Sequence, residues 1–218
     1  MRISYNSPVV LTFAILSLLE LLVQEFINPG VKQLFVVSSF EFSSFLSYFQ
    51  LTSHIFGHAN WEHYIANFSF ILLLGPLIEE KYGSFKVILL IFFTSLITGA
   101  LFLIAFDGGL LGASGVVFMF IILSSFTRYQ GRKIPLTFIL VAAIFLGKEV
   151  YNSFADNHIS EFAHILGGIC GAVFGFYLTP PITDQSEMEK GNQLDLIKKR
   201  KAVILQDKNN SEENNDGR

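Results

Sequence analysis

Residues 8–178 of this chain consist of six apolar runs joined by more polar connections. They cover residues 8–27, 61–80, 85–104, 114–126, 135–150 and 162–178. A helix rises about 1.5 Å per residue, so runs of about 20 residues can cross the hydrocarbon core of a bilayer. The pattern predicts an all-α, polytopic membrane protein with a bundle of six transmembrane helices. Glu20 interrupts the first run, and we expect it to face the bundle, because an ionised carboxylate in hydrocarbon costs about 3 kcal/mol or more.

The segment between the first two apolar runs has a different pattern. The sequence Asn-Pro-Gly at 28–30 ends the first helix, and the residues that follow, up to Gln50, are rich in Phe and Ser. Phe42, Phe45 and Phe49 recur at helical spacing beside polar residues. This first loop is therefore expected to lie in the membrane interface rather than to cross it. The alternative is an ordinary external loop.

Composition supports the membrane assignment. The chain has 218 residues, of which 51% are hydrophobic and 15% charged, and its mean hydropathy is +0.51. A soluble domain of this length is far less apolar. The net charge of −3 says little about partners, and we expect a lipid bilayer and no nucleic acid. Cys170 is the only cysteine, which excludes intramolecular disulfides and thiolate metal clusters and favours a packing role.

The basic residues predict which way the helices run. They occupy alternate connections and both chain ends, at Arg2, Lys81, Lys86, Arg128, Arg132, Lys133 and Lys198 to Lys201. Only Lys32 and Lys148 fall on the opposite side. By the positive-inside rule, both termini are cytoplasmic. We expect a multi-pass protein of the cell (inner) membrane, in which the second, fourth and sixth spans run from outside to inside.

The chain divides into a membrane domain and a tail. Residues 1–180 hold all six spans, and Pro180-Pro181 stops the last of them. Residues 181–218 are dominated by Asn, Glu, Asp and Lys near their end, which predicts a disordered cytoplasmic tail.

Gly112-Ala113-Ser114-Gly115 places one hydroxyl at the start of the fourth span. Glycines allow a tight turn and a close neighbour, and the N–H groups of a first helical turn can bind a developing anion. Ser114 is thus a candidate nucleophile. The alternative is a packing motif, since small residues, serine included, are common where transmembrane helices touch.

His164 is the candidate base for that nucleophile. It stands at the outer end of the sixth span, and Gly168, Gly171 and Gly175 follow at helical spacing on its face. These glycines would let another helix approach closely. If that helix is the fourth span, the imidazole meets Ser114 and can accept its proton. A hydrogen bond between helices is the alternative role for this histidine.

His63 and Asn67 lie four residues apart near the outer end of the second span, so they share one helix face. With the Ser114 backbone N–H they could donate to an oxyanion. A zinc site is the alternative, since His54 and His58 precede them and imidazoles at this spacing can bind zinc. No His-Glu-x-x-His pattern is present, and His54 and His58 are then structural residues that tie the first loop to the bundle.

Together these residues resemble the rhomboid family of intramembrane serine proteases in order, spacing and topology over roughly residues 8–180. The resemblance is carried by His54-x3-His58-x4-His63-x3-Asn67, by Glu79 to Gly83, by Gly112-Ala113-Ser114-Gly115 and by Ala163-His164-x2-Gly167-Gly168-x2-Gly171. The chain looks like the minimal six-helix form, with no soluble domain before the first span.

The resemblance implies roles for these residues. Ser114 would be the nucleophile and His164 the general base of a dyad without a carboxylate. His63, Asn67 and the Ser114 N–H would form the oxyanion hole, with Gly112, Gly115, Phe118 and Gly168 in support. A water-filled cavity would open outward, gated by the fifth span and the loop after it. No metal or cofactor is expected.

Two positions depart from the family pattern. Phe49-Gln50 stands where many members have Trp-Arg in the first loop, and Phe118 stands where a tyrosine often stacks under the histidine. The first change removes an arginine that braces the loop. The second keeps the stacking ring and loses its hydroxyl.

We therefore expect an intramembrane serine endopeptidase that cleaves transmembrane segments of other membrane proteins. One alternative is a catalytically silent relative that binds transmembrane helices. Another is a polytopic metal-binding or transport protein that uses the histidines. The sequence does not indicate the substrate, the cleavage-site preference or the oligomeric state.

Overall fold

All six predicted spans are helical in the computed structural model, which describes residues 5–126, 134, 136–152 and 159–178. The described elements are α1 (Pro8–Phe26), η1 (Pro29–Phe35), α2 (Phe45–Ser53), α3 (Trp61–Tyr82), α4 (Ser84–Ala105), α5 (Ser114–Ser124), α6 (Leu136–Asn152) and α7 (Ile159–Leu178). The predicted tail, Arg2 and the basic residues at 128, 132, 133 and 198–201 lie outside the described residues. The fold class is all-α as predicted.

Three described helices are long and apolar enough to cross a membrane, namely α1, α4 and residues 161–178 of α7. Their positions match the first, third and sixth predicted spans. The helix α5 is apolar but has only 11 residues, and α6 has 17. The helix α3 has 22 residues but carries polar groups near both ends, from Glu62 to Asn67 and from Glu79 to Lys81.

The first loop does not contain a spanning helix. It consists of the short 3-10 helix η1, an extended stretch and the nine-residue helix α2. Phe42 and Phe45 are more than 80% exposed on it, which fits aromatic side chains that face lipid. Gly99 of α4 lets the Leu51 carbonyl of α2 come close, because a Cβ at that glycine would lie only 2.7 Å from the carbonyl oxygen.

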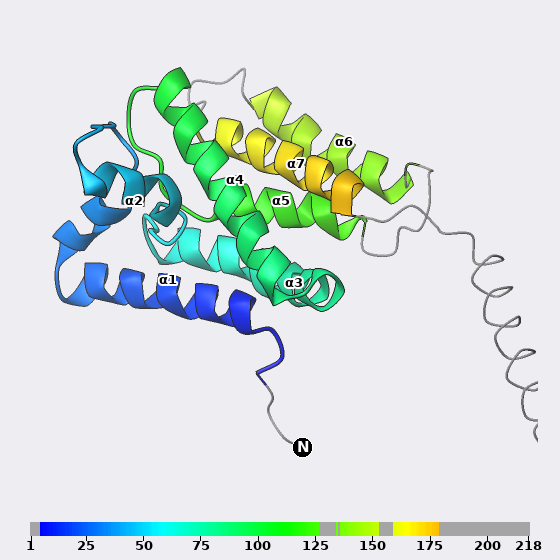
Figure 1. Ribbon diagram of the computed structural model, residues 1–218, viewed down its shortest axis with the longest axis horizontal. Coiled ribbons are helices and arrows are strands. Elements are labelled where there is room, and N and C mark those ends of the chain that lie inside the picture. The colour runs from blue at the N-terminus through cyan, green and yellow to red at the C-terminus, as the bar shows by residue number, and fades with distance from the viewer. Residues whose placement is uncertain (1–4, 127–133, 135, 153–158, 179–218) are drawn as a thin grey trace, which may run out of the picture. The chain divides into compact units, whose positions relative to one another are not determined.

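The helix α5 is at the centre of the bundle (Figure 1). Every residue from Gly115 to Leu123 is buried, and α5 contacts α3, α4, α6 and α7, most extensively α7. A helix that is apolar on all sides must be covered on all sides. The surrounding helices therefore fix the position of Ser114, its first residue.

A buried carboxylate connects the start of α1 to the end of α3. Both Glu79 oxygens accept hydrogen bonds from the first turn of α1, from the Val9 and Val10 N–H groups at 3.1 Å each. The Ser84 hydroxyl donates to the same carboxylate at 2.7 Å. The first N–H groups of a helix have no intrahelical partner, so Glu79 satisfies groups that would otherwise be unpaired inside the bundle.

We expect Glu79→Ala to lower the free energy of unfolding by about 3 kcal/mol, because it removes a buried charged acceptor from three donors. The loss is measured as a drop in the thermal unfolding midpoint in detergent. Glu80→Ala is the matched control, since Glu80 is exposed and its loss should change the midpoint little. Equal midpoints for the two variants would contradict this role of Glu79.

Candidate active site

The loop before α5 is held in place on two sides. Val37 and Leu110 form an isolated antiparallel bridge with hydrogen bonds of 3.0 and 2.8 Å. The Gly112 N–H donates to the His54 carbonyl at 2.9 Å. Gly112 has a φ of +117°, a backbone conformation that residues other than glycine rarely adopt. These contacts fix the entry into α5, whose first residue is Ser114.

The backbones of α5 and α7 touch through a row of glycines on α7. A Cβ at Gly167 would collide with the Gly115 carbonyl, one at Gly171 would meet the Met119 carbonyl, and one at Gly175 would strike the Phe126 ring. The row therefore runs through residues 167, 171 and 175, a spacing of four. The predicted Gly168 is adjacent to this row and is buried. The described close contacts with α5 are made by Gly167, Gly171 and Gly175.

This contact brings His164 to the face of α5 that carries Ser114. The Phe118 ring stacks on the His164 ring, with centroids 4.3 Å apart and planes 7° apart. Ser114 and Phe118 are four residues apart on α5, so they share a helix face. The aromatic partner predicted for His164 is therefore confirmed. The residue on which the imidazole stacks, Phe118, is one helical turn after Ser114 on α5.

His63 lies against Gly112, two residues before Ser114. A Cβ at Gly112 would be 2.6 Å from His63 Cε1 and 2.8 Å from its Nε2, so only glycine fits there. Asn60 caps α3 by accepting the His63 backbone N–H at 2.9 Å. The Ala59 N–H donates to His63 Nδ1 at 3.4 Å. A neutral ring that accepts at Nδ1 carries its proton at Nε2, which lies beside the Gly112 turn.

Asn67 lies one turn beyond His63 on α3. It is 6% exposed, and its Nδ2 has no hydrogen-bond partner in the described part of the chain. A buried amide donor without an acceptor is uncommon, because it costs about 1–3 kcal/mol. Such a donor is available to a ligand. The two neighbouring donors, His63 Nε2 and Asn67 Nδ2, thus come from the same helix face.

The rhomboid domain model matches residues 46–181, which is more than half of the chain. The chain belongs to the rhomboid family. Rhomboid-like protein 11, chloroplastic, from Arabidopsis thaliana is 26% identical to it in an alignment of 166 residues that covers 69% of this chain. The chain spans 58% of the length of that relative. Rhomboids are polytopic integral membrane proteins, and the family includes both serine proteases and inactive members.

In this rhomboid domain, His54 and His58 lie before α3 rather than on it. His54 is the C-cap of α2, where its Nδ1 bonds the Gln50 carbonyl and its Nε2 lies 3.4 Å from the Thr98 hydroxyl of α4. No helix continues from His54 through His58 to His63 in this described segment, so the three rings do not share one helix face. His54 instead connects the first loop to the bundle, which fits the structural role considered for it.

Metal binding by the histidines has no ligand set in the described residues. No three His, Cys, Asp or Glu side chains among them come close enough to hold an ion. The His58 Nδ1 is occupied by the Phe56 carbonyl at 3.0 Å, and the His63 Nδ1 by the Ala59 N–H. The zinc alternative thus lacks support in this part of the rhomboid domain.

Thr98 of α4 is a neighbour of the candidate site that the sequence pattern does not predict. Its methyl group would lie 3.3 Å from a Cβ at Gly115, and its hydroxyl bonds the Thr94 and Ser95 carbonyls at 2.8 and 3.0 Å. It lies between His54 and the start of α5. No sequence motif marks a lone threonine within an apolar run. By contrast, Gly167, Gly171 and Gly175 recur every four residues, a pattern that could have identified the α7 contact.

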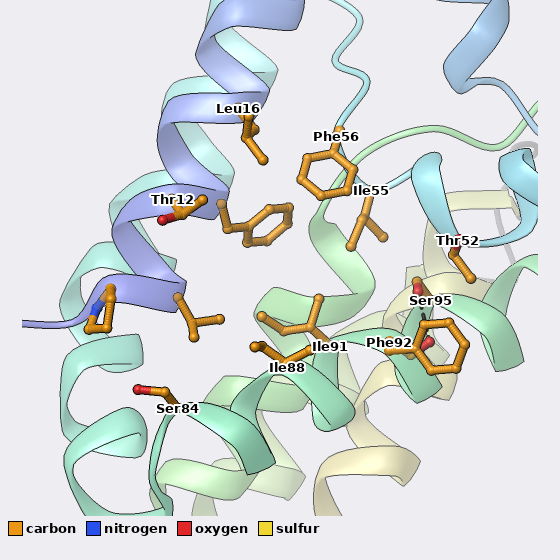
Figure 2. Close-up of a pocket in the computed structure, with 13 residues that line it drawn as sticks. Thr12, Leu16, Thr52, Ile55, Phe56, Ser84, Ile88, Ile91, Phe92 and Ser95 are labelled. Atoms are coloured by element: carbon orange, nitrogen blue, oxygen red, sulfur yellow. Dashed lines mark hydrogen bonds between the residues drawn. The ribbon is translucent and has the colours of Figure 1, made fainter.

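The described cavity of about 520 Å³ is not at this site. It lies between α1, α4 and the end of α2, and its lining includes none of the predicted site residues. Figure 2 shows Thr12 and Leu16 of α1 on one side and Ile88, Ile91 and Phe92 of α4 on the other. Its lining is mostly apolar and comes largely from α1 and α4, two helices long and apolar enough to cross a membrane. The volume of a cavity therefore does not identify the candidate active site in this fold.

The stability of this rhomboid domain is expected to fall in acid. Burial lowers the pKa of both His54 and His58 to about 4, whereas the unfolded chain keeps a pKa near 6.5. Below pH 6.5 the unfolded state therefore binds protons that the folded state does not. The stability contribution is complete above about pH 6.5 and is lost toward pH 4, at about 3 kcal/mol per histidine.

The measurement is the thermal midpoint in detergent at pH 7.5 and at pH 4.5, for the wild type and for His58→Asn. We expect a smaller drop between the two pH values for the variant, because one of the two titrating groups is gone. An identical drop in both proteins would show that His58 does not titrate in this range.

Proposed function

We propose that this protein is an intramembrane serine endopeptidase with Ser114 as nucleophile and His164 as general base. The stacking of Phe118 on His164 is the observation that carries the proposal. This stacking supports the proposal, because Phe118 shares a helix face with Ser114 and a base beside that face could act on the hydroxyl. A packing role alone would not explain a buried Asn67 amide without an acceptor and a His63 ring pressed against the turn before Ser114.

The reaction follows from the chemistry of these groups. Ser114 Oγ attacks the scissile carbonyl carbon while His164 takes its proton. The C–N bond then breaks as the imidazolium returns that proton to the leaving amine, which leaves an ester on Ser114. Water attacks the ester carbonyl and gives a proton to His164, and the bond between the acyl carbon and Ser114 Oγ then breaks as the imidazolium returns that proton to Oγ. No metal or cofactor enters this scheme.

The negative oxygen of each tetrahedral intermediate needs donors that are already in place. The Asn67 Nδ2, the His63 Nε2–H and the Ser114 backbone N–H are the three candidates. Each donor of this kind contributes about 3–4 kcal/mol to the transition state. Two observations support the first two donors, namely the unpartnered Asn67 amide and the contact of His63 with Gly112.

The substrates in this proposal are transmembrane segments of other membrane proteins. Ser114 starts a helix that is buried among membrane-spanning helices, so a peptide bond must reach it from the bilayer or its outer surface. Six spans, cytoplasmic termini and residence in the cell membrane complete the proposed arrangement. The polar tail would remain on the cytoplasmic side.

The test is cleavage of a labelled single-span protein by the purified full-length chain in lipid vesicles, together with labelling by a fluorophosphonate. We expect a defined cut in or beside the spanning segment and covalent labelling of one serine. A protein that binds the spanning segment but neither cuts it nor takes up the label would overturn the proposal. That result would favour the silent, helix-binding alternative.

A further inference from the structure

Lys32 is a basic residue in a loop where the positive-inside rule predicts few of them. It belongs to η1, and the sequence places this first loop opposite the connections that carry most of the basic residues. Lys32 is half-buried, and it forms no ion pair or hydrogen bond with the described part of the chain. Its positive charge is therefore available to a ligand.

A cavity of about 380 Å³ lies beside this lysine, between α1, η1 and α2. Its surface is almost entirely carbon, because the oxygen atoms of two lining residues, Glu20 and Ser53, are buried away from it. Three other lining side chains, Leu16, Leu19 and Phe49, are 41–51% exposed. The cavity thus opens to the outside of the bundle, where a membrane-spanning helix meets lipid.

The depth of this cavity matches one leaflet of a bilayer. The helix α1 has 19 residues, or about 28 Å at 1.5 Å per residue, so it crosses a hydrocarbon core of about 30 Å once. The cavity follows α1 from Leu16, near the middle of the helix, to Val23, near its end. Because η1 begins at Pro29, soon after α1 ends at Phe26, it lies at the level of the lipid headgroups.

Two observations place the Lys32 charge at the headgroup end of the cavity. Residues three apart lie on the same side of a 3-10 helix, so Lys32 shares a side of η1 with Phe35, which lines the cavity. The Lys32 charge also acts on Glu20, another lining residue. An apolar space with a positive charge at its mouth fits a molecule with an anionic head and an alkyl chain.

The volume of the cavity selects one acyl chain over a helix. A methylene group takes about the volume of a water molecule, about 30 Å³, so the cavity holds about 13 of them. A helix is about 10 Å across with its side chains, and the length from Leu16 to Val23 would need about twice the volume. Water needs two to four polar partners, which a carbon surface does not provide.

We propose that this cavity binds one acyl chain of an anionic phospholipid, whose phosphate pairs with Lys32. Since α1 and α2 both line the cavity, the bound lipid connects the first helix to the first loop. The helix α2 ends at His54, whose carbonyl accepts the Gly112 N–H. The lipid would therefore support the turn before Ser114. This binding does not require the proposed protease activity.

Native mass spectrometry of the purified full-length chain tests the role of the charge. The protein in detergent is mixed with equal amounts of palmitoyl-oleoyl phosphatidylglycerol and phosphatidylcholine, which share their chains and differ in net charge. We expect the wild type to retain one phosphatidylglycerol about fivefold more often, which corresponds to about 1 kcal/mol. Lys32→Gln should lose this preference, and Lys32→Arg should keep it. Lys86→Gln is the matched control, since Lys86 is exposed and does not line the cavity. An unchanged preference in Lys32→Gln would overturn the proposal.

Photolabelling in vesicles tests the position of the chain. Phosphatidylglycerol with a diazirine near the end of one acyl chain should label α1 around Leu16 more strongly than α3 around Leu73, which is 67% exposed near the middle of its helix. Val23→Trp should reduce the α1 label at least about fivefold, or about 1 kcal/mol of binding, because the indole fills the cavity. Leu73→Trp should leave it unchanged.

Equal labelling of the two helices in the wild type would overturn the proposal, whether or not Val23→Trp folds. Loss of the α1 label on addition of a single-span peptide would also overturn it, since a helix would then be the occupant.

Discussion

Replacing Ser114 with alanine is expected to abolish cleavage of a single-span substrate, with a fall in kcat of at least about 10⁴-fold. The hydroxyl oxygen is the atom that would form the acyl-enzyme, and losses of this size follow removal of a nucleophile. Thermal stability should change little, because the described hydrogen bonds of α5 do not use the Ser114 hydroxyl. Kinetics on the purified variant, paired with its unfolding midpoint, measure both effects.

Ser125→Ala is the matched control for this substitution. Ser125 follows the same helix at its other end, and its hydroxyl bonds the Ile122 carbonyl at 2.6 Å. Its removal should leave both cleavage and fluorophosphonate labelling near wild-type values. Cleavage that persists in Ser114→Ala would show that the nucleophile lies elsewhere, and loss of activity in both variants would point to a general disturbance of α5.

The second large effect is expected at Asn67. Asn67→Ala should lower kcat by about 10²–10³-fold with little change in KM, because an oxyanion donor acts mainly in the transition state. The unfolding midpoint should stay the same or rise, since the Asn67 Nδ2 satisfies no acceptor in the described structure. A residue needed only for packing would show the opposite combination, with lower stability and an unchanged kcat per folded molecule.

Ser69→Ala provides the control on the same helix. Ser69 is exposed and bonds the Ile65 carbonyl of its own helix at 2.6 Å, so its loss should affect neither rate nor midpoint. If Asn67→Ala keeps the wild-type kcat, then the tetrahedral oxygen is held by other donors. His63→Ala measured in parallel would show whether the neighbouring imidazole supplies them.

The helices were predictable because each depends on a long apolar run ended by polar residues or proline. The predicted start of the first span at residue 8 and of the fourth at residue 114 agree with α1 and α5. The aromatic ring beside His164 was also predictable, since Phe118 follows Ser114 at helical spacing and its stacking is observed.

The loops and contacts between helices were not predictable to the same degree. The histidine spacing that suggested zinc does not show that α2 ends at Ser53 and that a turn, rather than a helix, leads from His54 to α3. The close contacts of α7 with α5 include Gly167 beside the predicted Gly168, Gly171 and Gly175, and which glycines meet α5 depends on how the two helices pack. Such details depend on partners distant in the sequence, and a local pattern does not contain them.

The Glu79 carboxylate has a consequence for synthesis of the chain at the ribosome. It accepts from N–H groups of Val9 and Val10, 70 and 69 positions earlier. The first helix must therefore enter the membrane with these groups unpaired by protein and wait while about 70 more residues are translated. An N-terminal fragment released before residue 79 would lack this acceptor, so nascent-chain quality control would encounter a helix whose first turn is still incomplete.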